Sequence, residues 1–113
     1  MSELQAAKLL RIYLAESDRS GGRPLHEIIV EKCREMQIAG ATVLRAHEGF
    51  GSGPEIHHAH LLAHDRPIKI MIVDNPAKIE RLIPELESLL QSLLLGGTMV
   101  VSKVQAMRVR GNN

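Results

Sequence analysis

Residues 39–53 read Ala-Gly-Ala-Thr-Val-Leu-Arg-Ala-His-Glu-Gly-Phe-Gly-Ser-Gly. The run from Thr42 to Ala46 is typical of a strand, and it leads into a loop in which every second residue is glycine, at positions 49, 51 and 53. Glycine adopts positive φ without a Cβ clash and lets a ligand approach bare backbone. Successive amides in such a loop can hold an anion such as phosphate, although the same glycines could simply turn a hairpin.

The segments before and after this stretch alternate between strand-like and helix-like patterns. Residues 9–14 predict a first strand, and 16–23 form a polar loop. A helix is predicted from Pro24, because apolar residues recur at helical spacing: Leu25, Ile28, Ile29, Cys33 and Met36. Since Cys33 falls on this stripe, we expect a buried and unreactive thiol.

The second half repeats the alternation. Residues 68–73 predict a strand, and Asn75 with Pro76 predicts the start of a second helix. We expect Pro84 to kink or break that helix, and the pair Gly96-Gly97 to end it. Residues 98–110 predict one or two closing strands. The order β-α-β-β-α-β predicts an α+β fold of the ferredoxin-like, split βαβ type, an antiparallel sheet with two helices on one face.

Composition narrows the possible functions. The 113 residues predict one domain spanning 1–113, with 1–7 and 111–113 expected to be flexible. Only Tyr13 and Phe50 are aromatic, so the core must be aliphatic, and burial between subunits would help it. A net charge of +1 without a basic block argues against nucleic-acid binding. The lone cysteine and the absence of a signal peptide or membrane span predict a soluble, cytoplasmic protein.

Placed on this topology, the sequence resembles the PII-like signalling proteins, and within them an uncharacterised branch, DUF190. The resemblance extends from about Leu9 to Val109, and the segment from Gly40 to Gly51 is its specific part. The matching segments are Leu10-Arg11-Ile12-Tyr13, Pro24-Leu25 with Ile28-Ile29-Val30-Glu31, Ile38-Ala39-Gly40-Ala41-Thr42-Val43, Glu48-Gly49-Phe50-Gly51 and Ile72-Val73-Asp74.

The resemblance implies a homotrimer whose sheets pack inward and leave clefts between neighbouring subunits. In PII proteins those clefts bind adenine nucleotides, and the long loop after the second strand contacts a partner protein. Here the resemblance implies that the loop at 47–66 docks on a transporter or enzyme. It implies an effector site made of Gly40, Thr42, Glu48, Gly49, Phe50, Gly51, Gly96, Gly97, Thr98, Arg108 and Arg110.

Two parts of this implied site have distinct chemistry. Gly96 and Gly97 would present bare backbone to phosphate. Arg108 and Arg110, two apart on a strand, share a face, so their guanidinium groups could grip one polyanion, or they could simply solvate an edge strand.

The chain also departs from the PII pattern. Thr98 stands where a lysine usually follows the glycine pair, so one phosphate-neutralising charge is missing. Ser52-Gly53-Pro54-Glu55 replaces the loop residues that bind magnesium and 2-oxoglutarate, and the tyrosine that carries nucleotidylation in some members is absent from the loop. We therefore expect neither 2-oxoglutarate sensing nor uridylylation.

A histidine cluster, His57, His58, His60 and His64, offers an alternative function. On an extended strand His58 and His60 share a face, and two imidazoles so placed can bind Zn²⁺ or Cu²⁺, with Glu55 or Asp65 as a further ligand. The alternative is a metal-binding trimer of the metal-tolerance type. The histidines could equally be exposed loop residues, or sense pH if they gather near a three-fold axis.

Catalysis finds no support in the sequence. A serine elbow, a Cys–His pair on loops and paired carboxylates in a cleft are all missing, so we predict that the protein is not an enzyme. The favoured hypothesis is a trimeric regulatory protein that binds an adenine nucleotide or another small anion between subunits.

Overall fold

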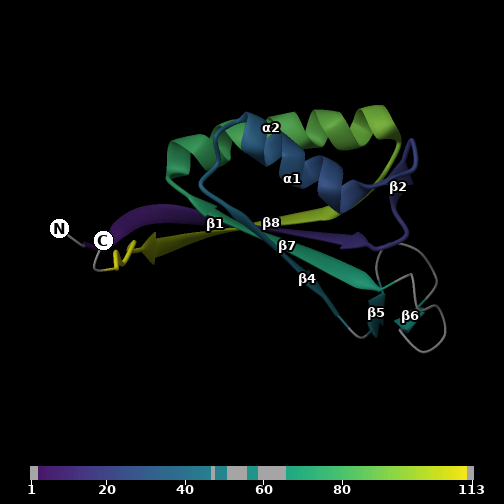
Figure 1. The fold of residues 1–113 in the computed structure, drawn as a ribbon, viewed down its shortest axis with the longest axis horizontal. Helices are drawn as coiled ribbons and strands as arrows, with labels where there is room; N and C mark the ends of the chain where they lie inside the picture. Colours follow the sequence, from purple (N-terminus) through teal and green to yellow (C-terminus); the bar gives the residue numbers. More distant parts are fainter. Residues whose placement is uncertain (1–2, 47, 51–55, 59–65, 112–113) are drawn as a thin grey trace.

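A computed structural model describes residues 3–46, 48–50, 56–58 and 66–111. Its main sheet has the strand order β4-β7-β1-β8, and all neighbouring strands are antiparallel. Two helices cover one face of this sheet, and the other face is bare (Figure 1). The elements are β1 (Gln5–Ala15), β2 (Arg19–Ser20), β3 (Arg23–Pro24), α1 (Leu25–Glu35), β4 (Ala41–Arg45), β5 (Glu48–Phe50), β6 (Ile56–His58), β7 (Pro67–Asp74), α2 (Pro76–Leu93) and β8 (Thr98–Ala106). The predicted ferredoxin-like α+β class is confirmed.

An aliphatic core fills the space between the sheet and the helices. Alternate residues of the two central strands point into it, because side chains of a strand alternate between its faces. They are Leu10, Ile12 and Leu14 of β1 and Ile68, Ile70 and Ile72 of β7. The helices contribute buried stripes at helical spacing: Leu25, Ile29 and Cys33 from α1, and Ile79, Leu82, Leu86 and Leu90 from α2. The predicted burial of Cys33 is confirmed.

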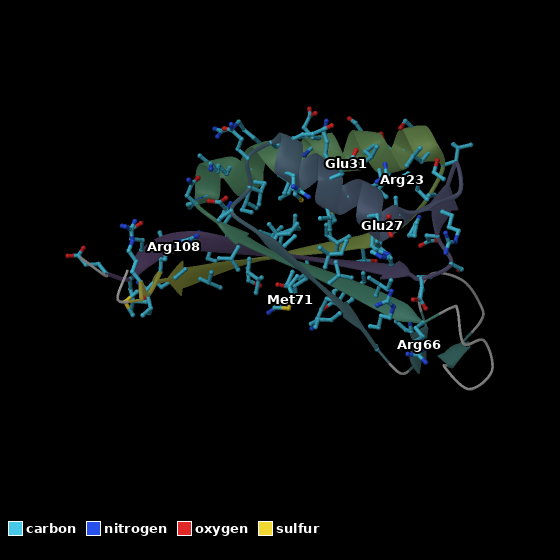
Figure 2. All side chains as sticks on the ribbon, viewed as in Figure 1. Arg23, Glu27, Glu31, Arg66, Met71 and Arg108 are labelled. Atoms are coloured by element: carbon cyan, nitrogen blue, oxygen red, sulfur yellow. The ribbon has the colours of Figure 1, made fainter. Side chains whose placement is uncertain are left out.

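The opposite face of the sheet carries apolar side chains that the described residues leave partly exposed. Tyr13, Leu44, Val73 and Val100 are each between 39% and 44% exposed. Strand register places them on one face together with Met71, which lies on the side of the sheet away from the helices (Figure 2). A bare apolar sheet face of this kind marks an interaction surface.

Some element boundaries differ from the sequence predictions. β1 begins at Gln5, earlier than Leu9, and β8 is a single strand that ends at Ala106, so the second closing strand is absent from the described residues. α2 is continuous across Pro84, and the break expected there is wrong. Pro84 lies on the exposed side of the helix, while Leu82 and Leu86 beside it are fully buried and hold the helix to the sheet.

The end of α2 is also displaced from the glycine pair. The helix stops at Leu93, and Leu94 adopts the left-handed conformation with φ 57°. The N–H groups of Leu94 and Leu95 donate to the carbonyls of Gln91 and Leu90 at 3.1 Å, which closes the helix before Gly96 is reached. The prediction that Gly96-Gly97 ends the helix is therefore wrong. Neither α1 nor α2 has the length and hydropathy needed for a membrane span among the described residues.

Candidate functional site

The strand register divides the predicted effector residues into two groups at opposite ends of the sheet. At one end, Ala41 pairs with Ile72, so Gly40 and Thr42 lie there; Arg108 and Arg110 follow Ala106, which pairs with Gln5 at the same end. Figure 2 shows Arg108 beside the chain termini. At the other end, Thr98 pairs with Tyr13, and Gly96 and Gly97 precede it.

The β5 residues belong to this second group, because they follow the far end of β4; they are Glu48, Gly49 and Phe50. The span of β8 from Thr98 to Ala106 separates the two groups by roughly 27 Å, from the rise of an antiparallel strand. One chain therefore does not bring the two groups together. Gly51 lies outside the described residues.

Three glycines of the predicted site differ in what surrounds them. A Cβ on Gly97 would lie 2.8 Å from Leu14 Cδ2 and 3.2 Å from the carbonyl oxygen of Tyr13, so this glycine is needed for packing against β1. A Cβ on Gly40 or Gly96 would meet no described atom within 4 Å, and neither residue has a left-handed φ. The folded chain thus gives no internal reason for glycine at 40 and 96, and both leave bare backbone open to an outside molecule.

Asp74 holds the backbone around Gly40 in place. Its Oδ2 accepts the N–H of Ala39 at 2.9 Å, and its Oδ1 accepts the N–H of Asn75 at 2.7 Å. Lys78 adds a second tie, because its Nζ donates to the carbonyl of Gln37 at 2.9 Å. The end of β7 and the start of α2 therefore fix the turn that leads into β4. The sequence pattern indicated Asp74 and Asn75 only as a helix entrance.

A cluster of charged side chains lies at the opposite end, where β1, β4 and β7 meet. The carboxylate of Glu16 forms an ion pair with Nε of Arg45. The backbone N–H of Glu16 donates to the carbonyl of Arg66 at 2.8 Å, and that of Ala46 donates to the carbonyl of Pro67 at the same distance. These bonds join the ends of three strands beside β5. No sequence pattern indicated this cluster, because its members are far apart along the chain.

The electrostatics of this cluster favour an ionised Glu16. The hydrogen bond from Arg45 lowers the pKa of the Glu16 carboxyl below its ordinary value, although burial opposes this. The charge of Arg45, a hydrogen bond from the backbone of Arg66 and the charge of Arg66 lower the pKa further. Glu16 is therefore a carboxylate at neutral pH, with its oxygens already engaged.

A groove of about 740 Å³ lies between α1 and the edge strand β4, outside the predicted site residues. Val30 and Val43 line it together with charged side chains of both signs. Arg23 Nη2 and Glu31 Oε2 form an ion pair at 3.0 Å along it, with Glu27 beside them (Figure 2). Since acidic and basic groups balance, the groove carries no clear preference for an anionic or cationic ligand.

The structure describes only part of the histidine cluster. His57 and His58 are in β6, whose backbone pairs with β5 so that Glu48 is opposite His58 in register. His60 and His64 lie outside the described residues, as do Glu55 and Asp65. Within the described ranges, no group of three or more histidine, cysteine, aspartate or glutamate side chains is placed to hold a metal ion.

Comparison with known proteins places this geometry in a family. The model of DUF190, described as "Uncharacterized ACR, COG1993", matches residues 7–106. The chain belongs to the DUF190 family. A UPF0166 protein of Aquifex aeolicus is 35% identical over 82 residues, which cover 71% of this DUF190 chain and 78% of the relative. UPF0166 protein MJ1524 of Methanocaldococcus jannaschii is 31% identical over 87 residues, or 76% and 81% of the two chains.

Solved structures share the fold of this DUF190 protein. CPII, a nitrogen regulatory PII-like protein from Thiomonas intermedia K12 solved with ADP, AMP and bicarbonate, superposes with a TM-score of 0.72 at 19% identity, covering 94% of this chain and 92% of its own. A putative PII-like signalling protein from Thermus thermophilus gives 0.63 at 18% identity, with coverages of 92% and 91%. The PII-like fold predicted from the sequence is confirmed.

Proposed function

We propose that this DUF190 protein is a non-catalytic regulator that binds an adenine nucleotide, or a similar small anionic effector, in clefts between the subunits of a homotrimer. The observation that carries the proposal is the division of the predicted site into two groups at opposite ends of the sheet. Because they are roughly 27 Å apart in one chain, they can act on one ligand only if different subunits supply them.

Two surfaces support assembly of the chain with copies of itself. The apolar sheet face with Tyr13, Leu44, Val73 and Val100 would be buried when sheets pack inward. The strands β4 and β8 are the open edges of the sheet, and open edges are places where another strand can add. A head-to-tail contact between unlike edges closes into a ring when the rotation permits, which is how a trimer forms.

The two groups would play different parts in the cleft. One subunit supplies open backbone at Gly96 with Thr98 and β5 nearby, and its neighbour supplies Gly40, Thr42 and the arginines at 108 and 110. Backbone N–H groups and guanidinium groups are both good donors to phosphate oxygens. CPII, which shares the fold, was solved with ADP and AMP, and this supports a nucleotide as effector.

The regulatory output would come from residues 47–66. Effector binding beside β5 would favour one arrangement of this segment, which would then dock on a transporter or enzyme. A ligand can shift such an equilibrium only by its difference in affinity for the two arrangements. The partner should therefore raise the affinity for the effector by the same factor by which the effector raises the affinity for the partner.

Calorimetric titration of the purified protein with ATP, ADP, AMP and cyclic dinucleotides tests the nucleotide site, with sedimentation to record the assembly. We expect a trimer that binds at least one of these nucleotides, one per subunit interface. An intact trimer that is silent to all of them would reject a nucleotide effector, and a monomer would remove the cleft altogether.

A further inference from the structure

The structure leaves one buried donor of the charged cluster without an acceptor. Nε of Arg66 is buried and has no hydrogen-bond partner among the described residues. A guanidinium N–H is always a donor in proteins, since arginine does not lose its proton at physiological pH. Buried donors in folded proteins are almost always bonded, and an orphan such as this one points to a bound water or ion.

The neighbouring carboxylate does not fill this need. Glu16 forms an ion pair with Nε of Arg45 and is also hydrogen-bonded to the backbone of Arg66, so its oxygens are engaged away from the Arg66 side chain. The three side chains Glu16, Arg45 and Arg66 carry two positive charges against one negative charge. The cluster therefore has both an unmet donor and an excess charge of one, and a monoanion would satisfy both.

We propose that Arg66, with Arg45 beside it, binds a small planar oxyanion of the carboxylate or bicarbonate type at this end of the sheet (Figure 2). Nε–H and the adjacent Nη–H of a guanidinium point in parallel, and this fork matches the two oxygens of such an anion. The burial of Nε favours a ligand of few atoms. A spherical halide could meet the charge but would not use both donors of the fork.

This site differs from the proposed nucleotide cleft in its residues and needs no nucleotide. Its place is informative, because Arg66 immediately precedes β7 and accepts a bond from Glu16 beside β1, while Arg45 ends β4. An anion bound to Arg66 would therefore sit at the junction where both ends of the segment 47–65 join the sheet. Occupancy of this site would act on the root of the segment that we propose contacts a partner.

Equilibrium dialysis of the nucleotide-free full chain against labelled bicarbonate, at mildly alkaline pH and constant ionic strength, tests the proposal. We expect saturable uptake of about one anion per chain, displaced by formate but not by an equal concentration of chloride. Arg66→Lys keeps the charge and removes the fork, so it should weaken binding by about tenfold or more. Arg81→Lys makes the same change on the exposed side of α2 and should bind as the parent does.

A second variant guards against a misfolded Arg66→Lys protein. Arg45→Gln removes the excess charge and releases Glu16 to accept from Arg66, so it too should weaken bicarbonate uptake while leaving the Arg66 fork in place. Absence of saturable uptake by the parent, equal uptake by the parent and Arg66→Lys, or displacement by chloride as effective as by formate would each overturn the proposal. Because no nucleotide is present, none of these outcomes bears on the nucleotide cleft.

Discussion

The carboxylate of Asp74 accepts the backbone N–H of Ala39 at 2.9 Å, across 35 residues of sequence. The same side chain also accepts the N–H of Asn75, and it is only 11% exposed. Asp74 therefore joins the start of β4 to the start of α2, immediately before Gly40.

Removing this carboxylate should loosen that junction. We predict that Asp74→Ala lowers the free energy of unfolding by about 1–3 kcal/mol, because it leaves two backbone donors without their acceptor. Urea unfolding measures the loss. Glu87→Ala, which removes a carboxylate from the exposed surface of α2, should change stability by less than about 0.5 kcal/mol. Equal stabilities for the two variants would contradict the role given to Asp74.

The two adjacent glycines after α2 should respond differently to alanine. In Gly97→Ala the new Cβ would lie 3.2 Å from the Tyr13 carbonyl, which cannot move aside easily, and we predict a loss of about 1–3 kcal/mol. Gly96→Ala should keep the stability of the parent within about 0.5 kcal/mol, because the new methyl group meets no described atom. On the proposed function, Gly96→Ala nevertheless weakens nucleotide binding. Thermal unfolding and calorimetry on both variants separate packing from ligand binding.

Leu94 is a site where glycine should stabilise the protein. It is 92% exposed and has a φ of 57°, so it gains little from burial and bears the cost of a left-handed backbone. We predict that Leu94→Gly raises the free energy of unfolding by about 1 kcal/mol. Ser92→Gly, inside the last turn of α2, should lower it by about 0.5–1 kcal/mol. A destabilised Leu94→Gly protein would show that Leu94 makes a contact in the assembly that one chain does not contain.

Acid should weaken the cluster at Glu16. The pKa of this carboxyl is lowered in the folded chain, so its contribution to stability is full above the ordinary value near 4.5 and is lost as pH falls through the folded value. We predict that Glu16→Gln flattens the pH dependence of the unfolding midpoint in this acidic range. Glu80→Gln, on the exposed side of α2, is the matched control. If the parent and Glu16→Gln have parallel acid profiles, the ion pair with Arg45 does not form in solution.

The thiol of Cys33 should be unreactive until the protein unfolds. Cys33 is 2% exposed, and burial raises its pKa to about 11, so the thiolate is scarce at neutral pH. A disulfide reagent should label it rapidly in urea and only slowly in buffer. Rapid labelling of the native protein would mean that α1 separates readily from the sheet.

The fold could be predicted from the sequence because the patterns that specify it are local. Strict alternation at Leu10, Ile12 and Leu14 and a helical stripe from Leu25 to Cys33 each indicate one element and its buried face. The errors came where packing overrides a local rule. Pro84 lacks a donor, yet Leu82 and Leu86 are buried on either side of it and α2 continues.

The site was less predictable, because its geometry depends on contacts between distant segments. The resemblance to PII-like proteins supplied Gly40, Gly96, Arg108 and Arg110, but only the strand register shows that they fall into two groups. The contact of Asp74 with Ala39 and the unmet donor on Arg66 leave no trace in periodicity or composition. Such contacts become visible only when the strand order is known.

The most direct test of the central claim is complementation between two defective chains. Gly96→Val should block the half of the cleft beside Thr98, and the double variant Arg108→Ala, Arg110→Ala should remove the other half. Each variant alone should lose nucleotide binding as a trimer. Refolded together, they form mixed trimers in which some interfaces have both halves intact, and we predict that nucleotide binding returns in part. Mixed trimers that bind no more nucleotide than the separate variants would contradict a cleft shared between subunits.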